Sequence, residues 1–334
     1  MAGEPVRIGL VGYGFGGRRF HAPFIAAAPE CELVGVVTRA TERRALIQQD
    51  LPGVPSFDSM AAVAAAGAEA VTISTPAPTH LDLVNEAIDR GLAIVCDKPF
   101  ALNSTAAAAA VKAARKAGVA LTVYQNRRWD SDLLTVRRLI AEDAIGRVMR
   151  FESRFERFRP GAAPNPAGGG TLRDFGSHLV DQALLLFGPV DRVHAEVHAA
   201  DGGLDDDFFL ALRHTGGVHS LLWGSSVQGA PGPRFRVTGT TGTYVVGGID
   251  GQAQQLIEGR TPATEGDKWG LEPPERWGKI HRGDVAEAVP SERGRWDTFY
   301  PAFAAAVRGD GPVPVDPADA VHALEVLDRA RSKA

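Results

Sequence analysis

The stretch VRIGLVGYGFGGRRFHAPFI, residues 6–25, decides the fold of this chain. Its first residues are mostly apolar, which is typical of a parallel strand buried on both faces. Glycines at positions 12, 14 and 17 follow in the spacing G-x-G-x-x-G, and a helix is expected directly after them. This order indicates a dinucleotide-binding turn, although an ordinary glycine-rich turn is the alternative.

Each glycine of this turn has a physical role in binding a dinucleotide. Gly12 permits the tight turn, Gly14 lets the backbone approach a pyrophosphate, and Gly17 lets the helix pack closely on the strand. The positive end of the helix then attracts the phosphate charge. Phe15 lies within the same turn and is expected to neighbour the cofactor as well.

Outward from this stretch, short apolar runs alternate with longer helical segments up to about residue 123. Such βα repetition predicts an α/β domain built on a doubly wound parallel sheet. We therefore expect residues 1–123 to form a dinucleotide-binding Rossmann domain. The further strands are expected at residues 32–38, 70–75, 92–97 and 120–125.

The pattern changes after residue 123, and residues 124–334 are expected to form an α+β domain that binds substrate and mediates oligomerisation. Strand-like runs between residues 191 and 248 follow one another with turns between them, which predicts an open, largely antiparallel sheet. Helices are expected at residues 130–142 and 172–187.

The remaining segments of this half carry turn and capping signals. Gly188 is expected to end the second helix, and Asp316 to cap a final amphipathic helix. A loop is expected at residues 160–170, and the polar stretch 258–295 is expected to be surface loop.

Bulk properties exclude several classes of protein. The 334 residues are 44% hydrophobic and 23% charged, with a formal net charge of -4, so two globular domains are expected. Without a polybasic stripe, no nucleic acid partner is expected. No apolar run reaches the roughly 20 residues that span a bilayer, and no leader segment is evident, so no membrane association and a cytoplasmic location are expected.

The end of the second strand favours NADP over NAD. An NAD-binding site places an acid there for the ribose 2′-hydroxyl, whereas this chain has Thr38 and Arg39, with Arg43 one helical turn further on. A hydroxyl and guanidinium groups would bind a 2′-phosphate. The alternative is that both arginines are merely solvated, with NAD accepted as well.

Three further segments carry a resemblance to a known family. They are STPAPTH at residues 74–80, CDKPF at 96–100 and GGGTLRDFGSHLVDQ at 168–182. Together with the glycine turn, and in this order, they resemble the Gfo/Idh/MocA oxidoreductases. The stretches RRFHAPFI, YQNRRWDSD and FESRFERFRP look most like the subgroup that contains NADP-dependent scyllo-inositol dehydrogenases. The resemblance runs through essentially the whole chain and implies an oxidoreductase acting on a sugar or polyol.

The resemblance assigns the reacting lysine of the family's E-K-P motif to Lys98, as a catalytic and substrate-binding residue. Asp97 stands where the family has glutamate and is expected near the cofactor. Physical reasoning agrees, because Lys98 follows an apolar strand and ligands bind outside the carboxyl ends of such strands. The alternative is a solvated surface lysine.

The family's D-x-G-x-H-x-x-D pattern falls on residues 174–181. The resemblance makes His178 the acid/base and Asp174 the residue that orients a substrate hydroxyl, both binding substrate. One alternative is a capping Asp174 with a packed His178. Another is a metal site formed by Asp174, His178 and Asp181, although no metal is expected because no further His or Cys cluster supports it.

Two other motifs add expected site residues. By resemblance, Thr75, Pro76 and His80 neighbour the cofactor, or else they simply end a strand and begin a helix. The segment YQNRRWD, residues 124–130, is expected to reach cofactor or substrate. Within it, Asn126 is assigned to the cofactor and Arg128 to the substrate. Arg127 and Arg128 could equally be structural ion-pair partners.

The expected chemistry is hydride transfer between NADP and a ring hydroxyl, with Lys98 stabilising the alkoxide and His178 taking the proton. Association is expected, since an antiparallel sheet with one uncovered face tends to associate, and the family resemblance implies a homodimer or homotetramer. The rival functions are a non-catalytic NADP sensor and a metal-dependent lyase or hydrolase.

Overall fold

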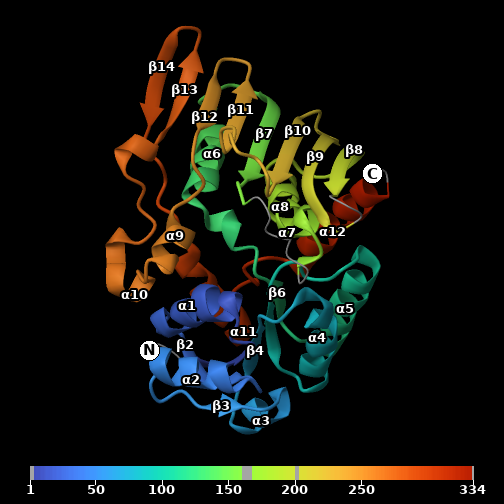
Figure 1. Ribbon diagram of the computed structural model, residues 1–334, viewed down its shortest axis with the longest axis vertical. Helices are drawn as coiled ribbons and strands as arrows, with labels where there is room; N and C mark the ends of the chain where they lie inside the picture. Colours follow the sequence, from blue (N-terminus) through green and yellow to red (C-terminus); the bar gives the residue numbers. More distant parts are fainter. Residues whose placement is uncertain (1–3, 160–167, 200–202, 333–334) are drawn as a thin grey trace. The chain divides into compact units, whose positions relative to one another are not determined.

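The computed structural model describes residues 4–159, 168–199 and 203–332 (Figure 1). The chain divides into two compact units. The first comprises Met1–Gln125, Ala253–Trp269 and Trp296–Val321, and the second Asn126–Gln252, Gly270–Arg295 and His322–Ala334. Each unit thus draws on three segments, whereas the sequence pattern offers only one division near residue 124. Most of the expected loop at residues 160–170 lies outside the described residues.

The first unit contains a six-stranded parallel sheet in the order β3-β2-β1-β4-β5-β6. This is the Rossmann order, with the point of reversal between β1 and β4. The expected α/β fold is confirmed, and the structure adds the two-residue β3, which is too short to give a sequence signal. The strands are β1 Val6–Val11, β2 Cys31–Val37, β3 Ser56–Phe57, β4 Ala70–Ile73, β5 Ala93–Cys96 and β6 Leu121–Val123.

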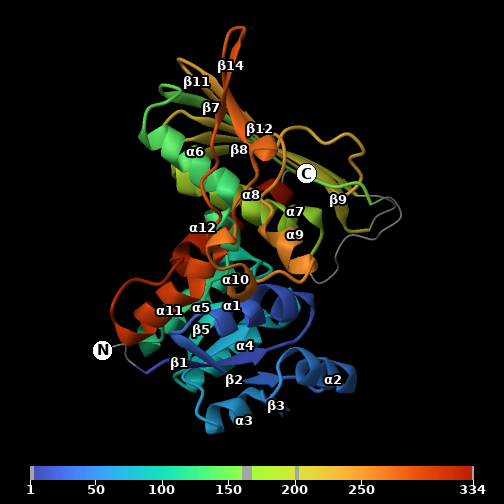
Figure 2. The same cartoon turned by 90° about the vertical axis from the view of Figure 1, so that its left-hand side faces the viewer.

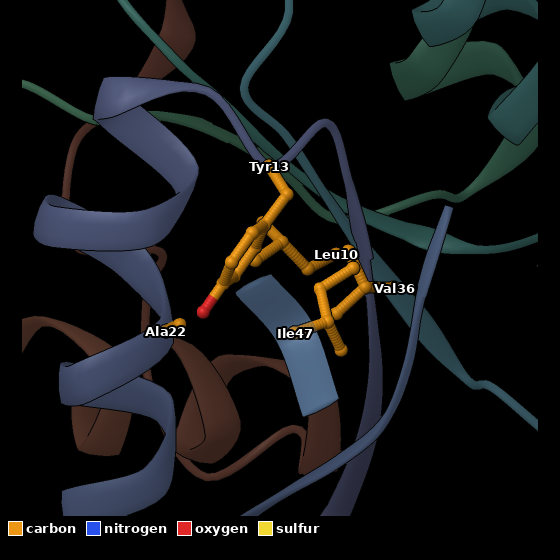
Figure 3. Close-up of a cluster of buried hydrophobic side chains, with 5 residues drawn as sticks. All are labelled: Leu10, Tyr13, Ala22, Val36 and Ile47. Atoms are coloured by element: carbon orange, nitrogen blue, oxygen red, sulfur yellow. The ribbon is translucent and has the colours of Figure 1, made fainter. Parts of the chain in front are cut away.

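Apolar side chains from the strands and helices fill the space beside this sheet. Figure 3 shows one such cluster, in which Leu10, Val36 and Ile47 pack with the ring of Tyr13. All are 2% exposed or less. Burying each of these side chains stabilises the unit by about 1.5–3 kcal/mol, before conformational entropy is counted.

The helices of the first unit connect these strands. The helix after the glycine turn contains a π-helical turn, η1 Gly17–His21, before α1 Ala22–Ala27. The others are α2 Thr41–Asp50, α3 Met60–Ala65, η2 Ala77–Thr79, α4 His80–Asp89, α5 Ser104–Ala117, α10 Pro262–Glu265, η6 Gly266–Lys268, η8 Trp296–Thr298 and α11 Phe299–Arg308, while α9 Gln252–Ile257 begins at the division.

The second unit contains an eight-stranded sheet in the order β14-β13-β12-β11-β7-β10-β9-β8. It is largely antiparallel, as expected, but β7 and β10 pair in parallel, so a simple meander was wrong. The reason is that β7 arrives before the helices and inserts between β10 and β11. The strands are β7 Val148–Glu156, β8 Val190–Ala199, β9 Asp205–His214, β10 His219–Ser225, β11 Phe235–Gly239, β12 Thr243–Val246, β13 Gly278–Arg282 and β14 Val285–Val289.

Helices pack on one face of this sheet, where α8 contacts β7 and β10 (Figure 2). The single helix expected at residues 172–187 is wrong, because it is interrupted at Phe175. Gly176 has no Cβ to clash with Leu327, so the chain approaches closely there. The helices are η3 Asn126–Trp129, α6 Ser131–Ala141, α7 Thr171–Asp174, α8 Gly176–Phe187 and η7 Pro274–Arg276, with α12 Pro317–Arg331 crossing the division.

The expected surface loop at residues 258–295 is also wrong. It contains α10 in one unit and the hairpin of β13 and β14 in the other, and its Trp269 is fully buried. The polar composition did not indicate strands here, because both strands of the hairpin expose most of their residues. In the parts of the chain that the structure describes, no helix combines the length and apolarity that crossing a bilayer requires.

Candidate functional site

The glycine turn has the shape that a dinucleotide pyrophosphate needs. Gly12 has a φ of 99°, and a Cβ there would lie 2.5 Å from the carbonyl oxygen of Ser74. A Cβ on Gly17 would collide with the carbonyl oxygen of Gly12. Beside Gly14, by contrast, no heavy atom of the described residues lies within 4 Å of the Cβ position. The two outer glycines are therefore required for packing, and the middle one leaves space for a ligand.

The turn stands at the place in the sheet where such ligands bind. It joins β1 to a helix that begins at Phe15, and β1 and β4 flank the point at which the strand order reverses. Ligands of open α/β sheets bind outside the carboxyl ends of the strands at this reversal. Phe15 is 63% exposed. The residues fit a bound dinucleotide, with the helix start facing its phosphates.

The corner after β2 presents the expected hydroxyl and guanidinium groups. Thr38 is buried, and its Oγ1 accepts a hydrogen bond from the backbone of Ala40 at 3.3 Å. Arg39 is exposed, and its Nε donates to the Asp58 carbonyl oxygen at 3.2 Å. Arg43 is exposed on the first turn of α2. Both guanidinium groups thus belong to exposed residues that follow β2.

The loop after β4 is held by His80. Thr75 and Pro76 are accessible, while His80 is buried. One ring nitrogen of His80 lies 2.9 Å from the Pro99 carbonyl oxygen, and the other lies 2.8 Å from the Thr75 carbonyl oxygen. His80 therefore connects the loop after β4 to the loop after β5, and its ring is enclosed by protein.

Lys98 and Asp97 follow directly on β5. Lys98 is half-buried, and its backbone N–H donates to Asp97 Oδ1 at 2.8 Å. Asp97 Oδ2 accepts from the Ser74 hydroxyl at 3.0 Å and lies 3.4 Å from Nε2 of His21. Burial opposes ionisation of this carboxyl, but the hydrogen bond and charge of His21 and the charges of His80 and Lys98 bring its pKa to about 2.

His21 is a residue that the sequence reasoning missed. It lies in the stretch RRFHAPFI, but no spacing rule singles it out. Only the π-helical turn, which cannot be read from the sequence, directs its side chain toward Asp97.

In the second unit, Asp174 and His178 lie on either side of the interruption at Phe175. Asp174 ends α7 and is half-exposed, and His178 lies in the first turn of α8 with 4% of its surface exposed. The rings of Phe155 and Phe175 stack with their centroids 4.3 Å apart, and the His178 ring lies 6.2 Å from that of Phe155. His178 is thus held against an apolar pair of rings, with Asp174 nearby on the chain.

Asp181, the last member of the same motif, is paired with Arg128. Both guanidinium contacts are short, at 2.9 Å from Nε and 2.6 Å from Nη2, and both residues are buried. Arg127 forms a similar pair with Asp130 at 2.9 Å. The geometry favours the structural alternative for both arginines, because a bidentate pair satisfies carboxylate and guanidinium together.

The sequence predicts that Asn126 binds the cofactor and that the chain binds no metal. Asn126 is buried and begins the second unit, and Gln125, also buried, ends the first segment of the first unit. Within residues 4–159, 168–199 and 203–332, no group of three or more His, Cys, Asp or Glu side chains is arranged to hold a metal ion. Asp181 is moreover engaged by Arg128, which weakens the proposed three-residue metal face.

A Rossmann sheet with a dinucleotide turn, joined to a mixed sheet of this kind, defines a class of nicotinamide-dependent oxidoreductases. Residues 6–125 match the family model described as oxidoreductase family, NAD-binding Rossmann fold, and residues 133–245 match the GFO/IDH/MocA C-terminal domain. The chain belongs to the Gfo/Idh/MocA family of NAD(P)-dependent oxidoreductases, as its motifs indicated.

Several relatives are similar along the whole chain. The scyllo-inositol 2-dehydrogenase (NADP(+)) IolW of Bacillus subtilis is 31% identical, over 98% of this chain and 93% of its own. The uncharacterised oxidoreductase YdgJ of Escherichia coli is 33% identical, over 97% and 95%. The solved structure of the Bacillus subtilis oxidoreductase YvaA superposes with a TM-score of 0.91 at 31% identity, covering 99% of this chain and 96% of that one.

Proposed function

We propose that this oxidoreductase transfers a hydride between NADP and a sugar or cyclic polyol, with scyllo-inositol as the first candidate substrate. The observation that carries the proposal is the position of Lys98 at the carboxyl end of β5, with Asp97 bonded to Ser74 beside the dinucleotide turn. The similarity to IolW, which is named for NADP and scyllo-inositol, supports the choice of cofactor and substrate.

In this proposal, Lys98 binds the oxygen of the reacting hydroxyl. As that oxygen loses its proton, the ammonium group stabilises the negative charge that develops on it. Asp97 fixes the peptide of Lys98 through its backbone N–H. When bound, the nicotinamide supplies the hydride chemistry itself.

His178 is the proposed general base, because an imidazole ordinarily titrates near neutrality and can take the hydroxyl proton and later release it. Asp174 orients a neighbouring hydroxyl of the substrate. The apolar rings of Phe155 and Phe175 beside His178 limit its access to water, which strengthens its polar contacts. As CH–OH becomes C=O, the hydroxyl proton would remain on His178, and a bound nicotinamide would take up the hydride.

We propose NADP rather than NAD because Thr38, Arg39 and Arg43 stand after β2 where an acid would repel a 2′-phosphate. The glycines Gly12, Gly14 and Gly17 would hold the pyrophosphate, with Phe15, Thr75 and Pro76 beside it. His80 and Asn126 complete the proposed cofactor-binding set, although the side chain of His80 acts by holding its loop.

We also propose that the chain forms a homo-oligomer through the outward face of the second sheet. Phe209 and Trp223 lie side by side on that face, with ring centroids 5.1 Å apart, and Arg154 covers Trp223 at 4.0 Å. Aromatic residues and arginine are enriched at interfaces between proteins.

The proposed function is tested by following nicotinamide absorbance when the purified protein is mixed with NADP+ or NAD+ and a panel of inositols and aldoses. NADP+ reduction by a cyclic polyol, lost in Lys98→Ala, is the expected result. Reduction of NAD+ alone would overturn the cofactor assignment. Tight NADP binding without turnover of any substrate in the panel would contradict the proposed substrate class.

A further inference from the structure

His21 is fully buried, with polar partners at both ring nitrogens. Its Nδ1 lies 2.7 Å from the hydroxyl of Tyr300, and its Nε2 lies 3.4 Å from Oδ2 of Asp97. The Tyr300 hydroxyl also lies 3.1 Å from Oγ1 of Thr72. A chain of polar groups therefore runs from β4 through α11 and η1 to the carboxylate beside Lys98, entirely within the first unit.

The backbone explains why His21 takes this position. A π-helical turn covers Gly17–His21, and the Ala22 N–H bonds back to the Gly17 carbonyl oxygen. Such turns add one residue to a helical turn, change the direction of the side chains that follow and occur frequently at functional sites. Here the turn lies in the same helix that begins at the dinucleotide glycines. The helix that would receive the pyrophosphate thus also carries a buried histidine to Asp97.

One set of hydrogen-bond directions links Thr72, Tyr300 and His21. Thr72 donates to the Tyr300 oxygen and the Tyr300 hydroxyl donates to Nδ1, which leaves the proton of the ring on Nε2, 3.4 Å from the Asp97 carboxylate. The phenol of Tyr300 keeps its proton, because burial raises its pKa well above the usual value. Tyr300 therefore fixes the tautomer of His21 that can donate to Asp97.

Asp97 connects the groups around the proposed site. Its Oδ1 accepts the backbone N–H of Lys98, and its Oδ2 accepts the hydroxyl of Ser74 at the end of β4. A Cβ on Gly16 would lie 3.0 Å from Oδ2, so the glycine turn passes directly over the carboxylate. A rotation of this carboxylate would release the Lys98 peptide and the Ser74 hydroxyl together.

From this geometry, and resting on the proposed role of Lys98, we propose that His21 is a positioning residue: oriented by Tyr300, it holds the Asp97 carboxylate in the one orientation that fixes the Lys98 peptide beneath the dinucleotide turn. It does so without touching substrate. The motif residue Asp97 thereby gains a partner from a helix more than 70 positions earlier in the sequence.

The charges around Asp97 make this role measurable as a pH effect. The titratable groups that face it are His21 from η1, His80 from α4, Lys98 and Cys96 beside it, Tyr124 after β6 and Tyr300 from α11. Burial alone would raise the pKa of Asp97, and the largest opposing contribution is the hydrogen bond from His21. Without His21 the carboxyl should therefore take up a proton at higher pH.

The test uses the full-length variants His21→Gln, Asp97→Asn, their combination, and Tyr300→Phe, assayed for kcat and KM with NADP+ and scyllo-inositol across the pH range. We expect His21→Gln to lower kcat about tenfold or more and to leave the KM for NADP+ within about threefold. In unfolding followed across the acid range, the step at which Asp97 takes up its proton should move up by about one pH unit or more. Asp97→Asn should lack that step, and Tyr300→Phe should show a smaller shift in the same direction. Tyr244→Phe, a buried tyrosine of β12 in the second unit, is the matched control with unchanged kinetics.

The combined variant decides between positioning and independent effects. If His21 acts through Asp97, the double variant is no slower than Asp97→Asn alone. Fully multiplicative losses, or a His21→Gln enzyme whose acid unfolding profile matches the wild type, would overturn the proposal. Thermal unfolding of each variant shows whether a loss of kcat reflects loss of fold. If His21→Gln does not fold, Tyr300→Phe is assayed in its place.

A second readout separates this proposal from the proposed function. Acylation of lysines by acetic anhydride at pH 6, quantified for each peptide by mass spectrometry, needs no substrate. In His21→Gln, Asp97 loses the partner that holds it against the Lys98 peptide. The segment that carries Lys98 should then open more often, so Lys98 should react at least about threefold faster while Lys112 and Lys116 do not change. If the wild type shows no turnover, the proposed function fails, and unchanged Lys98 labelling would independently overturn the role of His21.

Discussion

Two motif carboxylates of this chain, Asp97 and Asp181, sit in contrasting surroundings. Asp181 is 2% exposed and locked in a bidentate pair with Arg128 inside the second unit. Asp97, in the first unit, is held by a hydroxyl, a backbone N–H and the ring of His21, and its side chain is 20% exposed. A single guanidinium holds Asp181 at both oxygens, whereas three separate groups hold Asp97.

From this difference we expect a structural role for one carboxylate and a functional role for the other. A buried guanidinium–carboxylate pair is costly to break and cannot change its charge near neutrality, so it suits a structural role. A carboxylate held by weaker donors keeps its charge only while each donor stays in place, so it can respond to a ligand or to pH. Asp181 is therefore expected to hold the fold, and Asp97 to serve the proposed chemistry.

The largest effect is expected from breaking the locked pair. Arg128→Leu should lower the free energy of unfolding by about 3–5 kcal/mol, because it leaves Asp181 buried without its partner. Urea unfolding measures this change. The double variant Arg128→Met/Asp181→Leu should recover most of the loss, since it buries no lone charge. If the free energy of unfolding of Arg128→Leu lay within about 1 kcal/mol of the wild-type value, the structural role of this pair would be contradicted.

A nearly equal effect, on rate and not on stability, is expected from Lys98→Ala. Loss of the group that stabilises the alkoxide should lower kcat about 10²–10³-fold, equivalent to about 2.7–4 kcal/mol. Lys98 is half-buried beside the turn, so urea unfolding should change little. Steady-state kinetics measure the loss of kcat, and the urea unfolding curve measures the stability. A kcat within threefold of the wild type would contradict the role of Lys98.

The next effect concerns acid stability. Asp97 has a folded pKa of about 2, below its ordinary value of 3.8, so its ionised form stabilises the fold above that ordinary value. This contribution, about 2 kcal/mol, should disappear as pH falls from about 5 to 2. The stability gap between the wild type and Asp97→Asn should therefore narrow over that range. A gap that is independent of pH would show that the carboxylate charge is not what stabilises this region.

The smallest effect sharpens the comparison with a second arginine. Unlike Arg128, Arg39 is exposed, and its Nε donates to the backbone carbonyl oxygen of Asp58. Arg39→Ala should weaken NADPH binding about tenfold, near the low end of what a hydrogen bond to a charged group contributes, and leave NADH binding within about twofold. Fluorescence titration with both cofactors measures this. Equal losses for both cofactors would contradict a 2′-phosphate contact.

Much of the fold was predictable because its signals are local. The apolar runs gave the main strands of the Rossmann sheet, and the glycine spacing placed the turn after β1. The family followed from the order of its motifs and is confirmed by matches to both domain models. The break at Phe175 and the insertion of β7 beside β10 were not predictable, because both depend on packing between distant segments.

The candidate site was predictable only as far as its motif residues. The sequence named Lys98, Asp174 and His178 by resemblance, and their roles stay predictions. It could not reveal that Arg128 is paired with Asp181, since 53 residues separate them. Nor could it reveal His21 and Tyr300, because a π-helical turn and a segment returning to the first unit bring them to Asp97.

The most direct test of the central claim is deuterium transfer from scyllo-inositol deuterated at its ring carbons to NADP+. The account predicts one deuterium in the reduced cofactor formed by the wild type, and about 10²–10³-fold less of this product formed by Lys98→Ala in the same time. Absence of reduction by the wild type, or a reduced cofactor without deuterium, would contradict direct hydride transfer from this polyol.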